Sequence, residues 1–288
     1  MGLVFGSLVG TLQIIVAPKS DLYNNIFEVS CAILVSFLSR ALGSIKNGKY
    51  FCYTAIVQGS ITLILPGYVI LCGSLEIQSK NIVSGAVRMI YAIVYSLFLG
   101  FGISVGATIY GLIDSNAVSV ADGNSLCNKS PLSPWFGFLF VPVFVVGIAL
   151  VNQARWMQIP AMIIIASAGY AVTYFVDQKF PDSAQLTSAI GAFVIGILGN
   201  IHSRLTHGLG FAAMLPAIFI LIPFCLASQG SIINGIQAGN GNSTHDLYTT
   251  MSLGSGMLNI SVGLTVGLFS AALVVYPAGK KRSGLFTF

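Results

Sequence analysis

Long apolar runs constrain the fold of this chain more than any other feature of its sequence. An α-helix needs about 20 consecutive apolar residues to cross the hydrocarbon core of a bilayer. The 288 residues contain nine such runs, at roughly 1–16, 26–45, 51–72, 84–112, 135–153, 157–176, 185–203, 208–228 and 251–276. Only 7% of the residues are charged, whereas a soluble domain carries about 25%. The sequence therefore predicts an all-α polytopic membrane protein with about nine transmembrane helices.

The first run is short, and Met1 opens directly into it without the basic residues and cleavage site of a signal peptide. We therefore expect the chain to be a piece of a longer protein, with one membrane helix missing before residue 1. With that helix restored, the architecture would have ten spans.

The loops predict the orientation of the chain. Seven basic residues follow odd-numbered runs and four follow even-numbered runs, and basic loops favour the cytoplasm. The possible glycosylation sites Asn128 and Asn242 both lie in even-side loops, which agrees with a cytoplasmic C-terminus. The net charge of +5 is spread over loops, so we expect no nucleic-acid partner. The membrane itself stays open between the plasma membrane and an endomembrane such as the vacuole.

Pro66 and Gly67 interrupt the third apolar run. Proline lacks a backbone N–H, so carbonyls near Ile61 and Thr62 should lose their helical partners. A membrane protein tolerates such a break only where protein or a water-filled cavity satisfies the freed groups. Glu76, Lys80 and Arg88 follow closely, so we interpret this stretch as half of a transport site.

A second stretch resembles the first. Residues 65–74, LPGYVILCGS, align with residues 222–231, IPFCLASQGS. The two share the proline (Pro66 and Pro223) and the Gly-Ser pair that follows it (Gly73 and Ser74, Gly230 and Ser231). Each is followed by a helix with a GxxxG spacing, Gly102 to Gly106 and Gly263 to Gly267, which favours close packing or oligomer contacts. The five-helix spacing predicts an inverted repeat of the kind found in secondary transporters. The alternative is a chance likeness between short apolar segments.

Longer stretches resemble a known family. Residues 27–45, 62–106, 191–219 and 274–288 are similar to fungal pheromone-regulated membrane proteins of the threonine/serine exporter superfamily. The resemblance implies two five-helix modules, at 1–112 (lacking its N-terminal part) and 135–288, joined by an extracytoplasmic loop at 113–134. It also implies a further N-terminal region. Bacterial relatives resemble proton-coupled exporters of threonine and serine. They tend to have an aspartate where this chain has Glu76, and they often repeat Pro-Gly where it has Pro223-Phe224.

Four charged residues in or beside the apolar runs are candidates for function. Glu76 is the first choice for a proton-coupling carboxylate, because intramembrane ionisable groups are usually functional; the alternative is an interfacial acid paired with Lys80 or Arg88. Arg88 would neutralise Glu76 or hold a solute carboxylate, unless it extends to the inner surface. Glu28 is a second proton candidate or an interfacial acid, and Arg40 is interpreted as an anchor near the outer interface.

No metal, cofactor or catalytic pattern is visible among the five cysteines or elsewhere, so no enzyme activity is expected. The leading hypothesis is a secondary transporter in the lipid bilayer that moves a small polar solute, of the threonine/serine type, coupled to protons. The alternative is a non-transporting membrane scaffold or signalling protein.

Overall fold

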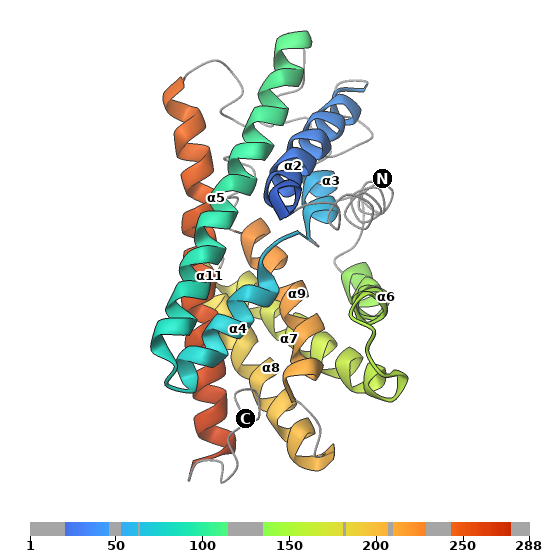
Figure 1. Ribbon diagram of the computed structural model, residues 1–288. Coiled ribbons are helices and arrows are strands. Elements are labelled where there is room, and N and C mark those ends of the chain that lie inside the picture. The colour runs from blue at the N-terminus through green and yellow to red at the C-terminus, as the bar shows by residue number, and fades with distance from the viewer. Residues whose placement is uncertain are drawn as a thin grey trace. The chain divides into compact units, whose positions relative to one another are not determined.

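The computed structural model describes residues 21–45, 53–62, 64–114, 135–180, 183–206, 210–228 and 243–277, and these ranges contain helices and turns but no strand. The helices, shown in Figure 1, are α2 (Asp21–Ser44), α3 (Tyr53–Ile61), α4 (Gly67–Gln78), α5 (Ile82–Ile113), α6 (Trp135–Val151), η3 (Trp156–Gln158), α7 (Ile159–Lys179), α8 (Ala184–Thr206), α9 (Gly210–Ser228) and α11 (Ser243–Val275). The second to ninth predicted runs all fall on helices, and the first lies outside the described residues. The all-α prediction is confirmed for the part of the chain that the structure describes.

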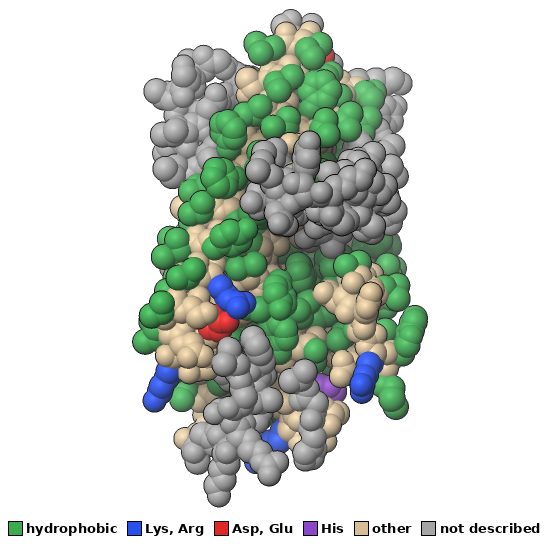
Figure 2. Space-filling view, viewed as in Figure 1, with side chains coloured by type: hydrophobic (Ala, Val, Ile, Leu, Met, Phe, Trp, Pro, Cys, Tyr) green, Lys and Arg blue, Asp and Glu red, His purple; other side chains and the backbone are tan. Residues whose placement is uncertain are grey.

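Five of these helices are long and apolar enough to cross a membrane: Phe27–Ser44, Ile82–Ile113, Trp156–Lys179, Ala184–Thr206 and Gly254–Val275. Three shorter apolar helices cover Gly67–Ile77, Phe136–Val151 and Gly210–Cys225. Large apolar side chains point outward on several of them; Leu112 is 82% exposed and Val143 67% exposed. Figure 2 shows the same on one face, where hydrophobic side chains dominate and charged ones are sparse. These features define an integral membrane protein, while the count of nine crossings stays a prediction.

The chain forms two compact units. Unit 1 contains residues 1–65, 93–131 and 230–256, and unit 2 contains residues 66–92, 132–229 and 257–288. The division passes through the long helices α5 and α11, and it separates α3 from α4 at Pro66. The two predicted modules, 1–112 and 135–288, divide the chain at other places and stay a prediction.

In unit 1, α2 packs against α3 and against the C-terminal half of α5. Gly102 and Gly106 of α5 make the second contact possible. A Cβ at Gly102 would lie 3.0 Å from the Val29 carbonyl oxygen, and one at Gly106 would meet the Ile33 carbonyl oxygen still more closely. The two backbones touch because these positions carry no side chain.

In unit 2, the helices α7, α8 and α9 pack against one another, α6 packs on α7 and α9, and α4 packs on α9. The C-terminal half of α11 contacts α8 through Gly263 and Gly267, where an added Cβ would meet the carbonyl oxygens of Gln185 and Ala189. Both GxxxG faces are thus buried against helices of the same chain. The expectation that these faces mediate oligomer contacts is corrected, because neither is free to meet a second copy.

The helix is interrupted between Ile61 and Gly67, at the proline that follows Leu65. The Ile61 carbonyl oxygen accepts hydrogen bonds from the N–H groups of Ile64 (2.9 Å) and Leu65 (3.1 Å). It therefore keeps partners in a tightened last turn, contrary to expectation, whereas Pro66 has no N–H to offer the Thr62 carbonyl.

The second predicted interruption is not seen at its proline. Helix α9 continues through Pro216 and Pro223 and ends at Ser228. A proline inside a membrane helix is tolerated where neighbouring helices compensate for the lost hydrogen bond, and α7, α8 and α4 surround α9 in unit 2. Gly230 and Ser231 lie outside the described residues.

Candidate functional site

A tight turn joins α4 to α5 and brings the predicted charges together. The Asn81 N–H donates to the Glu76 carbonyl oxygen (3.0 Å), and the Lys80 N–H donates to the Ile77 carbonyl oxygen (3.1 Å). This pair of bonds is a Schellman motif, which normally has glycine at the left-handed position. Here that position is Lys80, with φ of 67°. The turn reverses the chain within three residues, so α5 runs back along α4.

Two glycines let α4 and α5 approach closely. A Cβ at Gly85 would lie 2.8 Å from the Gly73 carbonyl oxygen and 2.6 Å from Cγ1 of Ile77, and one at Gly73 would lie 3.0 Å from Cγ of Met89. The close contact fixes which residues of the two helices face each other. Gly73 thus allows α4 and α5 to pack closely. The sequence alone had placed it only in the repeated pattern of a proline followed by Gly-Ser.

Glu76 lies in this hairpin with its carboxylate buried. The residue is 1% exposed, Oε1 lies 3.1 Å from Nη2 of Arg88, and Oε2 accepts a hydrogen bond of 2.7 Å from the Ser84 hydroxyl. Lys80 is exposed, so Arg88 is the partner of the acid. Both groups that hold the carboxylate come from the first turns of α5. The buried carboxylate thus has one cationic partner and one hydroxyl partner.

A polar stripe continues from Glu76 along α4. Cys72, one turn earlier, is buried, and the side chains of Tyr68 and Arg88 lie near its thiol. Tyr68, one turn earlier again, is 46% exposed and packs edge-on against Phe211 of α9, with ring centroids 5.9 Å apart. Residues four apart share a helix face, so Arg88 lies beside this stripe while it pairs with Glu76.

Ser74 connects the same short helix to α11. Its hydroxyl oxygen lies 3.0 Å from Oγ1 of Thr265. Ser74 donates to the Ile70 carbonyl oxygen (2.8 Å), and Thr265 donates to the Ser261 carbonyl oxygen (2.7 Å). Each hydroxyl has one proton, so the interhelical bond forms only when one of them leaves its own helix. The pair can therefore exchange an intrahelical hydrogen bond for one between α4 and α11, beside the hairpin that holds Glu76.

The structure places the remaining predicted residues apart from this hairpin. Glu28 belongs to unit 1, where its half-buried side chain hydrogen-bonds with Tyr95. Pro66 and Gly67 begin α4, and Gly67 packs against Ile222 and Phe219 of α9. Asn128 and Asn242 lie outside the described residues.

Arg40 was expected to be an anchor at the membrane surface, and this expectation is wrong. Arg40 is 3% exposed. Its Nη1 donates to the Ala107 carbonyl oxygen of α5 at 2.6 Å, and its Nε is buried without a hydrogen-bond partner. A uniformly apolar helix gives no signal in the sequence for which of its faces is buried.

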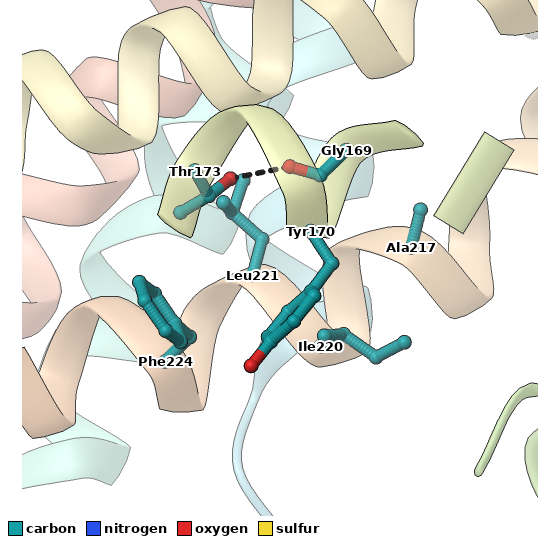
Figure 3. Close-up of a pocket in the computed structure, with 7 residues that line it drawn as sticks. All are labelled: Gly169, Tyr170, Thr173, Ala217, Ile220, Leu221 and Phe224. Atoms are coloured by element: carbon teal, nitrogen blue, oxygen red, sulfur yellow. Dashed lines mark hydrogen bonds between the residues drawn. The ribbon is translucent and has the colours of Figure 1, made fainter. Parts of the chain in front are cut away.

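Asp177 is a further polar residue that sequence reasoning missed, because the sixth apolar run was ended at residue 176. Helix α7 continues to Lys179, and Asp177 lies near Cys225 of α9 with Oδ1 buried and without a partner. A crevice between α7 and α9 begins one turn away, lined by Thr173, Tyr170 and Phe224 among others (Figure 3). The Thr173 hydroxyl is already bonded to the Gly169 carbonyl oxygen (2.7 Å), and the crevice is too narrow for a water molecule.

Within the described ranges, no group of three His, Cys, Asp or Glu side chains could hold a metal ion. Apolar helices of membrane length, an interrupted helix and a buried ion pair define the class: a polytopic α-helical membrane protein. Residues 1–110 match the family described as "Putative threonine/serine exporter".

Curated relatives cover nearly the whole chain. A protein named "Pheromone-regulated membrane protein 10" is 54% identical over 290 residues in Kluyveromyces lactis, covering 98% of this chain and 30% of the relative. Proteins of the same name are 51% identical in Yarrowia lipolytica (100% of this chain, 27% of the relative) and in Candida glabrata (98% and 36%). The chain belongs to this family of fungal pheromone-regulated membrane proteins with a threonine/serine exporter domain. It spans about a third of the length of these relatives. No solved structure matches it.

Proposed function

We propose that this chain is the membrane part of a secondary transporter that exports a small polar solute, of the threonine/serine type, in exchange for protons. The buried Glu76 carboxylate, held by Arg88 and Ser84 at the end of the short helix α4, is the observation that carries the proposal. The description of the matching family supports the class of solute. Arg88 and Glu76 are the residues we assign to coupling, and Glu28 is a second proton candidate.

The ion pair suggests how coupling works. When Glu76 is ionised, it holds the Arg88 guanidinium against α4, because an unpaired charge in an apolar environment is costly. When Glu76 takes up a proton, this attraction is lost and Arg88, whose side chain is 43% exposed, swings outward. The first turns of α5 are then free to move relative to α4. Proton binding thus changes the conformation of the helix hairpin that follows the break.

Helix contacts within each unit support the predicted inverted repeat. Gly102 and Gly106 of α5 contact α2 at four positions, and Gly263 and Gly267 of α11 contact α8 at four positions of the same spacing and also at Phe193. The matching positions are Val29 and Gln185, Ala32 and Ser188, Ile33 and Ala189, and Ser36 and Ala192.

A second contact is similar, although its spacing differs by one residue between the two copies. Gly43 of α2 lies against Tyr53 of α3, and Gly199 of α8 lies against Gly210 of α9. Five spans separate each helix from its counterpart in the predicted order, so the two copies would cross the membrane in opposite directions. This arrangement would allow alternating access, with one module rocking against the other and the C-terminus in the cytoplasm.

A counterflow assay tests the transport function. The whole protein is reconstituted into vesicles preloaded with unlabelled threonine, and uptake of trace labelled threonine is followed. The proposal predicts uptake well above that of empty vesicles, with competition by serine. Uptake equal to that of empty vesicles for threonine, serine and other small polar solutes would instead favour the scaffold or signalling function.

A further inference from the structure

Arg40 joins α2 to α5 in unit 1 as the second of two consecutive cross-helix contacts. The Ser36 hydroxyl donates to the Ile103 carbonyl oxygen at 2.6 Å, and one turn later Nη1 of Arg40 donates to the Ala107 carbonyl oxygen at 2.6 Å. The guanidinium lies flat against Gly111, where a Cβ would come within 3.4 Å of Nη1. These contacts hold the cation at a fixed place between the two helices.

The charge of Arg40 is not balanced by these contacts. A carbonyl oxygen satisfies a donor, but it does not neutralise a guanidinium that has left water. Arg88, by contrast, forms an ion pair with Glu76. Arg40 nevertheless lies inside an apolar span, Phe27–Ser44, and its Nε–H has no acceptor. A buried cation with a free donor is complementary to an anion.

Hydroxyl groups of unit 1 lie near Arg40 in the sequence or in the structure, and one of them is also a buried group without a partner. Ser39 is fully buried, and its Oγ also lacks a partner, although a helical serine can usually bond to its own backbone. The Tyr53 hydroxyl lies 2.6 Å from Oγ of Ser36. Because Ser36 gives its proton to Ile103, Tyr53 must be the donor in that contact. Unit 1 therefore holds two buried polar atoms without partners, on adjacent residues of α2.

We propose that Arg40 and Ser39 form a binding site for the carboxylate of a small solute. The guanidinium would supply charge and the free Nε–H, and the Ser39 hydroxyl would supply a further hydrogen bond, as in charge-assisted recognition of carboxylates elsewhere. The inference rests on the proposed function in naming an amino acid as the solute. The site itself concerns the carboxylate, which can be tested without transport.

Binding is measured on the whole protein in nanodiscs of phosphatidylcholine, a lipid without net charge, so that anionic headgroups cannot occupy the site. The probes are threonine, its decarboxylated analogue 1-amino-2-propanol, and acetate. Wild-type protein should bind threonine about tenfold or more tightly than the amine, and acetate should compete with threonine. Arg40→Gln should abolish both the preference and the competition. Arg204→Gln, at an exposed position of α8, is the matched control and should preserve both.

Ser39→Ala keeps the test decisive if Arg40→Gln fails to fold. Removing a buried oxygen without a protein partner should leave the unfolding temperature unchanged or higher, whereas threonine binding should weaken several-fold. The inference is overturned if the threonine-to-amine preference survives in Arg40→Gln, or if Ser39→Ala binds threonine as wild-type protein does. Acetate competition that is lost only in these variants would support the site even in a protein that shows no threonine flux.

Discussion

Nη2 of Arg88 lies 3.1 Å from Oε1 of Glu76, and the two side chains differ in exposure, at 43% for the base and 2% for the acid. The pair can therefore open by movement of Arg88 alone, while Glu76 stays buried. Ser84, which also holds the carboxylate, is exposed. The acid thus lies just beneath two partially or fully exposed side chains.

Removing Arg88 should destabilise the protein more than removing both partners. Arg88→Met leaves a buried carboxylate without its counter-charge, and we expect a loss of about 2 to 3 kcal/mol in the free energy of unfolding. The double variant Glu76→Gln with Arg88→Met should recover part of this loss. Reversible unfolding in detergent measures both. Arg204→Met, at an exposed position, should change stability by less than about 0.5 kcal/mol. A single Arg88 variant as stable as the double variant would contradict the ion pair.

The close approach of α4 and α5 makes Gly85 intolerant of a side chain. Gly85→Ala would place Cβ 2.8 Å from the Gly73 carbonyl oxygen, which belongs to the backbone and cannot turn away. We expect a loss of about 1 to 3 kcal/mol from overpacking. Gly147→Ala in α6 is the control, because no atom lies within 4 Å of its added Cβ. There the better helix propensity of alanine should raise stability by up to about 1 kcal/mol. Equal effects at the two glycines would refute the close contact.

Replacing Lys80 by glycine should raise the stability of the protein. Its φ of 67° lies in the left-handed region, which glycine adopts without steric cost, so Lys80→Gly should stabilise the protein by about 1 kcal/mol. Gln153, with φ of 51° at the end of α6, should respond in the same direction. Lys179→Gly, in the last helical turn of α7, should instead cost up to about 1 kcal/mol. Thermal unfolding of the three variants checks the signs, and a destabilised Lys80→Gly would disprove the turn geometry.

The equivalent contacts at Gly106 and Gly267 predict similar losses of stability when either glycine is replaced by alanine. Gly106→Ala and Gly267→Ala each push a Cβ into a backbone carbonyl oxygen, of Ile33 and Ala189 respectively. Because neither backbone can yield without moving its helix, each variant should lose about 1 to 3 kcal/mol. Unfolding measurements that find one variant neutral and the other strongly destabilised would argue against equivalent packing in the two copies.

Much of the helical architecture could be predicted from the sequence, because uninterrupted apolar runs have few alternatives to membrane helices. The interruption before Gly67 followed from the missing N–H of Pro66. The same reasoning failed at Pro223, since a proline is compatible with a helix that its neighbours enclose. Sequence spacing alone cannot distinguish a break from a tolerated proline.

The candidate site was only partly predictable. Glu76 stood out as a carboxylate beside an apolar run, but its partner depended on the turn at Lys80, which directs Arg88 rather than Lys80 toward it. The burial of Arg40 depends on its packing against α5, a contact between residues 67 apart in sequence. Such pairings are set by tertiary structure, and no local pattern encodes them.

The pH dependence of threonine flux in Glu76→Gln vesicles tests the central claim most directly. Glutamine keeps the size and hydrogen-bonding ability of the side chain but cannot exchange a proton. In wild-type vesicles, an imposed pH gradient should drive threonine against its concentration gradient. In Glu76→Gln vesicles we expect threonine counterflow without a pH gradient to persist, while the imposed gradient no longer drives accumulation. Threonine accumulation in Glu76→Gln that follows the pH gradient as in wild-type protein would contradict a coupling role for Glu76.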